Sequence, residues 1–128
     1  MSHEVVPQEI LGQVRWPGTD CIVLIDLETC PHVSRIDFIP SNIALIGILK
    51  KKHYLSEFKF AFPVILTEAS YKMTLPYVLA RIFPHTTRDQ KIFIVSKDES
   101  LTKEIQKLGI PVLGIPHLFQ EQLSGLAD

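Results

Sequence analysis

Apolar runs alternate with polar stretches along this chain, and they predict strands that are buried on both faces. A central parallel strand has no solvent side, so its sequence lacks the apolar–polar alternation of a half-exposed strand. The run at residues 21–26 is the clearest case, since five apolar residues lead directly into Asp26. Runs of this kind predict five strands, at residues 21–26, 42–49, 62–67, 91–95 and 110–115.

Helical periodicity fills several of the gaps between these strands. Residues 70–83 carry apolar side chains at three- and four-residue steps, and Pro76 either begins this helix within its first turn or kinks it. Shorter helices are predicted at residues 51–60, where aromatic residues lie four apart, and at residues 117–123. Residues 27–41 contain two prolines and are predicted to form a loop with at most one helical turn.

The helix after the fourth strand has its own start and stop signals. Ser96 and Glu99 have the spacing of a capping box, in which each side chain bonds the backbone amide of the other residue. Gly109 suits the left-handed position just beyond a helix C-terminus. The apolar face of this helix is predicted to consist of Leu101, Ile105 and Leu108.

The order of these elements predicts an α/β fold. Strands that alternate with helices favour a three-layer domain, with a mostly parallel central sheet of about five strands flanked by helices. Residues 21–128 are predicted to form this single domain. Residues 1–20 are predicted to be a lead-in segment, with a short amphipathic helix, a turn and Trp16 packed against the sheet.

Composition narrows the class of protein. A chain of 128 residues fits one domain, and its formal net charge of −1 gives no global field that would attract a polyanion. The two cysteines, Cys21 and Cys30, are too few for a disulfide scaffold and indicate reduced thiols. No apolar run reaches the roughly 20 residues that a membrane span needs, and no secretory signal is evident, so we expect a cytosolic or nuclear protein.

Acidic residues follow two of the predicted strands. Asp26 ends the first strand and Asp98 follows the fourth, and right-handed crossovers would bring both to the carboxyl edge of the sheet, where open α/β sheets bind ligands. Either carboxylate could instead have a structural role, Asp26 by capping a turn and Asp98 by capping the following helix.

These motifs resemble those of the PIN-like nucleases, and especially their NYN branch. The resemblance covers roughly residues 21–115. It depends on Ile25-Asp26-Leu27-Glu28 followed by Pro31, and on Ile94-Val95-Ser96-Lys97-Asp98 followed by a helix, a glycine and Pro-Val-Leu-Gly. Such nucleases hold Mg²⁺ or Mn²⁺ between several carboxylates, and the metal activates a water for phosphodiester cleavage.

The sequence departs from the family pattern at the acidic positions. Thr29 stands where the family has asparagine, Ser100 stands where it has a second aspartate, and residues 71–76 lack the expected carboxylates. Asp26 and Asp98 match the family and are the candidate catalytic residues. The candidate metal ligands are Asp26, Glu28, Asp98 and Glu99, with Glu68 as a further substitute.

The resemblance therefore implies a degenerate domain of the kind that ends scaffold proteins of heterochromatin-silencing assemblies. Such a domain has no catalytic activity and no cofactor, lies in a larger nuclear chain and binds a protein partner. No membrane or small-molecule partner is expected. An active Mg²⁺- or Mn²⁺-dependent ribonuclease is the alternative.

Two further alternatives stay open. Asp26-x-Glu28-Thr29 also resembles the first motif of the DEDD 3′–5′ exonucleases, and His85-Thr-Thr-Arg-Asp89 has the spacing of a late motif in that family. A nucleic-acid-binding module is the other alternative, because basic residues could form a phosphate-contacting patch. The candidate basic residues are Lys50, Lys51, Lys52, Lys72 and Lys97, with Arg81 nearby.

Overall fold

The computed structural model describes residues 19–54 and 59–126. The amphipathic helix expected near the N-terminus and the packing of Trp16 lie outside the described residues. So does much of the aromatic helix expected at residues 51–60, of which a 3₁₀ turn at Lys51–His53 is described.

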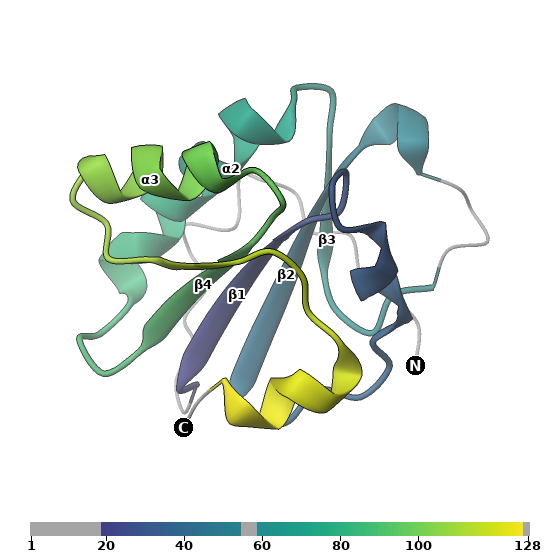
Figure 1. Ribbon diagram of the computed structural model, residues 1–128, viewed down its shortest axis with the longest axis horizontal. Coiled ribbons are helices and arrows are strands. Elements are labelled where there is room, and N and C mark those ends of the chain that lie inside the picture. Colours follow the sequence, from purple (N-terminus) through teal and green to yellow (C-terminus); the bar gives the residue numbers. More distant parts are fainter. Residues whose placement is uncertain (1–18, 55–58, 127–128) are drawn as a thin grey trace.

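Five strands form one sheet in which every pair of neighbours is parallel, which confirms the predicted fold class (Figure 1). The order across the sheet is β3-β2-β1-β4-β5, so β1 lies at the centre. All six residues of β1 are buried, as expected from its unbroken apolar sequence. The strands are β1 Cys21–Asp26, β2 Ile43–Lys50, β3 Val64–Thr67, β4 Lys91–Val95 and β5 Leu113–Ile115.

The connections differ in length and type. Two α-helices are described, α2 at Tyr71–Ile82 and α3 at Glu99–Lys107. The other helical segments are short 3₁₀ turns: η1 Pro31–Arg35, η2 Lys51–His53, η3 Phe83–His85 and η4 Gln120–Gly125. Within the described residues, neither α-helix has the length and apolar character that a bilayer span requires.

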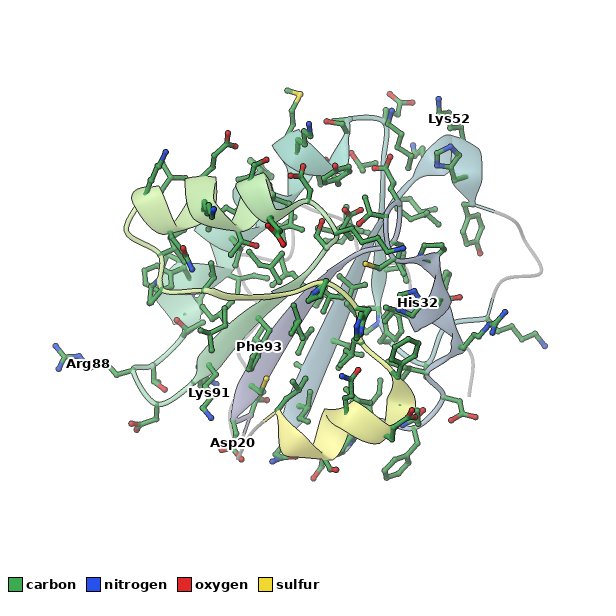
Figure 2. The ribbon with its side chains drawn as sticks, in the orientation of Figure 1. Asp20, His32, Lys52, Arg88, Lys91 and Phe93 are labelled. Carbon is green, nitrogen blue, oxygen red and sulfur yellow. The ribbon has the colours of Figure 1, made fainter. Side chains whose placement is uncertain are left out.

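The two faces of the sheet are covered differently. Alternate residues of β1 point to opposite faces, so Ile22 and Leu24 pack on one side and Val23 and Ile25 on the other. The first side is covered by α2 and α3, which bury side chains such as Leu79 against it. The second side is covered by loops and 3₁₀ turns, whose buried side chains include Val33, Phe60, Phe62, Leu118 and Leu123. Figure 2 shows side chains on both sides of the strands.

The chain reverses its direction across the sheet between β1 and β4. It runs outward from β1 through β2 to β3, and α2 then carries it back to β4 on the other side of β1. Ile25 pairs with Val95, so Asp26 and Ser96 emerge next to each other at the carboxyl edge. This is the switch point at which open α/β sheets bind ligands.

Several predicted helix boundaries need correction. The capping box of Ser96 and Glu99 is wrong, because Asp98 is the N-cap of α3 and the Ser96 hydroxyl bonds Asp26 instead. Leu108 is also wrongly placed on the buried face of α3, since it lies at the C-cap and is 70% exposed. The left-handed position of Gly109 is confirmed by its φ of 90°.

The ends of the other elements also differ from the predictions. Pro76 lies inside α2 and does not begin it. The fifth strand is shorter than the predicted span, because only residues 113–115 pair with β4. The closing helix is a 3₁₀ segment at Gln120–Gly125 and not an α-helix at residues 117–123.

Candidate functional site at the carboxyl edge

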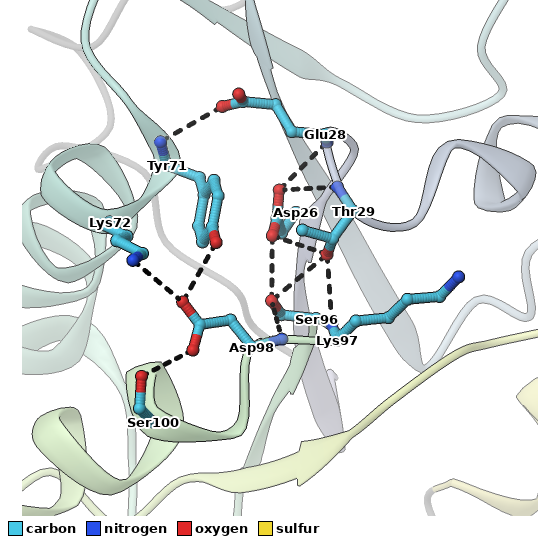
Figure 3. A network of polar contacts seen from close by, with 9 residues as sticks. All are labelled: Asp26, Glu28, Thr29, Tyr71, Lys72, Ser96, Lys97, Asp98 and Ser100. Carbon is cyan, nitrogen blue, oxygen red and sulfur yellow. Dashed lines mark hydrogen bonds and ion pairs between the residues drawn. The ribbon is translucent and has the colours of Figure 1, made fainter.

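Asp26 lies at the centre of a polar network at the carboxyl edge, between β1, β4 and the start of α2 (Figure 3). Its side chain is fully buried. Oδ1 accepts hydrogen bonds from the backbone amides of Glu28 at 3.0 Å and Thr29 at 3.3 Å. Oδ2 accepts from the hydroxyls of Thr29 at 2.8 Å and Ser96 at 2.9 Å. The carboxylate therefore closes the turn after β1 and ties that turn to the end of β4.

The hydroxyls of Thr29 and Ser96 determine which atoms of this network donate hydrogen bonds and which accept them. Each hydroxyl has one proton, and both protons point to Asp26 Oδ2. Their oxygens then act as acceptors: Thr29 Oγ1 receives the amide of Lys97 at 3.1 Å, and Ser96 Oγ receives the amide of Asp98 at 3.1 Å. The carboxylate thus organises the backbone of the loop between β4 and α3 through these hydroxyls.

Glu28 lies in the turn after β1, because the strand ends at Asp26. Its Oε2 accepts the backbone amide of Tyr71 at 3.2 Å. Ser70, the N-cap of α2, makes no side-chain capping bond, so Glu28 satisfies one of the free amides at the start of that helix. A carboxylate near a helix N-terminus also interacts favourably with the helix dipole.

Asp98 lies at the outer part of the network. Its Oδ1 accepts the Ser100 hydroxyl at 2.6 Å, and its Oδ2 accepts the Tyr71 hydroxyl at 3.0 Å. Lys72 Nζ forms an ion pair with Oδ2 at 3.8 Å. Although Asp98 is the N-cap of α3, its carboxylate makes no capping bond to that helix.

These contacts shift the pKa values of Asp98 and Tyr71 in opposite directions. The Ser100 hydroxyl contributes most to lowering the pKa of Asp98, with smaller contributions from Tyr71 and Lys72, while partial burial opposes the shift. The pKa of Tyr71 is raised to about 12, chiefly by burial and then by its bond to Asp98 and the charge of that carboxylate. The Tyr71 hydroxyl therefore stays a hydrogen-bond donor at neutral pH.

Glu99 and Glu68, the other candidate acids, line two separate hollows. Glu99 is exposed at the start of α3 and lines an open groove of about 280 Å³ between α3 and β5. Glu68 is exposed after β3 and lines a cavity of about 250 Å³ together with Lys50, Lys51 and Lys52.

The candidate basic residues follow the ends of β2 and β4 or lie in α2, and their surroundings differ. Lys50, Lys51 and Lys52 lie at the end of β2 and in η2, where they share their cavity with the acidic Glu68. Lys72 is paired with Asp98, and the Lys97 side chain extends away from the network into solvent (Figure 3). Arg81 is near the C-terminus of α2 and lies over the Tyr77 ring, 5.7 Å from its centroid.

The candidates for an exonuclease motif lie at the opposite edge. His85 and Asp89 precede β4, whose first residue, Lys91, pairs with Cys21 at the amino end of β1. In a parallel sheet that edge is one strand length away from Asp26, so the structure does not bring these residues together.

The donor set at the carboxyl edge does not fit a divalent cation. Mg²⁺ and Mn²⁺ need several free oxygen ligands, whereas the four acceptor positions of Asp26 are taken by four protein donors. Among the described residues, no three His, Cys, Asp or Glu side chains gather in a group that could hold a metal ion.

Sequence reasoning missed three residues of this network. The sequence places Thr29 and Ser96 in family motifs and Ser96 in a capping box, but it assigns neither hydroxyl to Asp26 and gives Tyr71 no polar role. A hydroxyl at the end of each of two neighbouring strands is the sequence signal that could have indicated a shared carboxylate.

No protein-family model, curated protein or solved structure matches the chain.

Proposed function

We propose that this chain is a catalytically inactive PIN-like domain, which acts as a protein-interaction module in a larger nuclear assembly of the gene-silencing type. The observation that carries the inactivity is the saturation of Asp26, the acid that the nuclease pattern places at the metal. The PIN-like assignment, the nuclear location and the silencing role depend on the resemblance of the two acidic motifs.

The energetics of Asp26 support this proposal. A metal ion could bind the carboxylate only if it displaced at least one of the four donors, and each buried donor left without an acceptor costs about 1–3 kcal/mol. Two of these donors are backbone amides of the adjacent turn, so they cannot turn away without unfolding that turn. A cation at this position would therefore break local structure before gaining its first ligand.

The surroundings of Asp98 support it further. A hydroxyl, Ser100, replaces the second aspartate of the family pattern and occupies one carboxylate oxygen. Tyr71 and the cationic Lys72 occupy the other oxygen. A nearby positive charge repels a second cation, which lowers metal affinity further.

An interaction role is supported by the outer surface of α2. Met73 is 71% exposed and Tyr77 is 48% exposed, and their four-residue spacing puts them on the same side of the helix. Large exposed apolar side chains that lie together are typical of protein-binding surfaces.

A nuclease assay tests the inactivity. Purified protein is incubated with single-stranded RNA and Mn²⁺, beside the Asp26→Asn variant as a matched control. We expect no cleavage by either protein and no saturable Mn²⁺ binding by calorimetry. Cleavage that disappears in Asp26→Asn would overturn the proposal in favour of a metal-dependent ribonuclease.

A second experiment tests the interaction module. The tagged chain is expressed in cells, and proteins that copurify with it from a nuclear extract are compared with those of a Met73→Glu, Tyr77→Glu double variant. We expect a specific partner to be lost from the double variant and kept by Lys103→Glu, an exposed change on α3. If binding instead decreases steeply with salt and with Lys50→Glu, the nucleic-acid alternative replaces this proposal.

A further inference from the structure

Residues 116–126, which we call the C-terminal strap, cross the face of the sheet that lacks α-helices. The strap contains η4 and is the yellow segment in Figure 1. Leu118 and Leu123 are its buried anchors, and they belong to the same apolar cluster as Val23 and Phe93 of the sheet. The strap therefore closes a core face that would otherwise be open to water.

Polar contacts hold the strap to the segment at residues 30–38. The Gln120 side chain accepts the amides of Asp37 at 3.0 Å and Phe38 at 3.3 Å, and donates to the Phe38 carbonyl at 2.6 Å. The Cys30 thiol donates to the Pro116 carbonyl at 3.3 Å. The Gln120 contacts are solvent-exposed, so each contributes less to stability than a buried bond.

Contacts between tilted aromatic rings join the same two segments. The Phe119 ring contacts His32 of η1, at a centroid distance of 4.9 Å, and also His117 of the strap, at 5.0 Å. Figure 2 shows His32 on the side of the sheet where η1 lies. Among the described residues, Nε2 of His32 is buried and has no hydrogen-bond partner.

Within the part of the chain that the structure describes, the charged groups that act on the pKa of His32 are all basic. Lys97 from the loop after β4, His117 from the strap and Arg35 from η1 act on this ring. Burial contributes most to lowering the pKa of His32, and the three basic groups lower it further. The neutral ring can leave Nε2 unprotonated, whereas the imidazolium must place a second N–H there.

We propose that the C-terminal strap is an acid-sensitive latch, which is closed while His32 is neutral and opens when the ring is protonated against Phe119. The added proton at Nε2 has no acceptor and lies among basic groups, so the ring moves away from Phe119. Phe119 then loses its contact with His32. The exposed Gln120 hydrogen bonds alone do not hold the two segments together, and the strap separates from residues 30–38. The five-stranded sheet stays folded, because its other face is still covered by α2 and α3.

The direction of the pH effect follows from the sign of the shift. Because the pKa of His32 is lower in the closed state than in the open state, closure is fully favoured above the ordinary histidine value of about 6.5. The preference for closure is lost as the pH falls from that value through the lower pKa of the closed state.

NMR spectroscopy of the intact chain tests the latch without any variant. The His32 ring resonances are followed from about pH 7.5 to about pH 5.5, the range in which histidines titrate, together with amide hydrogen exchange. We expect the amides of Asp37, Phe38, Gln122 and Leu126 to lose protection as the ring titrates, while the β1 amides stay protected. Retained protection of the strap after the ring has titrated, or simultaneous loss in β1, would overturn the proposal.

Two variants complete the test. His32→Phe keeps an aromatic ring against Phe119 and removes the proton, so the strap amides should stay protected at the acidic end of the titration. His53→Gln removes a histidine from the exposed η2 turn and should leave the wild-type loss of protection unchanged. A wild-type response in His32→Phe would overturn the proposal, because the effect would then not depend on this ring.

Discussion

Asp26 and Asp98 emerge at the same edge of the sheet, yet their surroundings differ. Asp26 is fully buried and accepts two backbone amides and two hydroxyls. The Asp98 side chain is 16% exposed, and its partners are two hydroxyls and a lysine side chain that is itself 64% exposed. The difference shows that a carboxylate at a strand end can either hold the backbone in place or make only side-chain contacts near the surface. Its hydrogen-bond donors determine which of these two roles it has.

The largest expected effect is the loss of the Asp26 carboxylate. Asp26→Ala leaves four donors without their acceptor in a closed site, so we expect the free energy of unfolding to fall by about 3–5 kcal/mol. Urea denaturation followed by circular dichroism measures this change. A loss no larger than that of Asp98→Ala would remove the distinction between the two carboxylates.

The Thr29 hydroxyl is expected to have the next largest effect. Thr29→Val keeps the shape of the side chain but removes the donor to Asp26 and the acceptor of the Lys97 amide, at a cost of about 1.5–3 kcal/mol. Ser34→Ala is the control, because it removes an exposed hydroxyl whose bond to Pro31 stays within η1, and it should cost less than about 1 kcal/mol. Equal effects of the two variants would contradict the central role of the network.

A smaller effect is expected for Asp98→Asn, and it should depend on pH. Because the pKa of Asp98 is lower in the folded protein, its carboxylate stabilises the fold above the unfolded value of about 3.9. This contribution is lost as the pH falls through the folded pKa, so wild type and Asp98→Asn should converge in stability below it. Thermal unfolding at neutral and strongly acidic pH provides the comparison, and a difference that persists in acid would argue against this assignment.

The smallest effect is expected for Lys72→Ala. The Lys72 ion pair is long and largely exposed, and such pairs contribute about 0–1 kcal/mol. The change in stability should decrease further when salt is added. A salt-independent loss above about 1 kcal/mol would show that Lys72 supports the network by packing and not by charge.

The strands were predictable because each one is determined by its own sequence. The buried run of β1 needs no distant residue to identify it, and the same holds for β2 and β4. The short β5 was predicted less well, since Pro111 and Pro116 lack the amide that a longer ladder would need.

The site was less predictable because its contacts join distant positions. Ser96 and Glu99 fit a local capping box, but Ser96 instead bonds a carboxylate that is 70 positions away in the sequence. The bond of Glu28 to the amide of Tyr71 spans 43 positions and replaces a cap that Ser70 does not provide. Local spacing cannot reveal either choice, because both depend on the order of the strands in the sheet.

The place of β4 beside β1 also has a consequence for the folding kinetics. Ser96 lies 70 positions after Asp26, so the entropy of a long loop is lost when that hydrogen bond forms. We therefore expect the carboxyl edge to become ordered after the folding barrier has been crossed. Interactions formed that late slow unfolding and leave the folding rate almost unchanged, so they contribute to how long the native state persists.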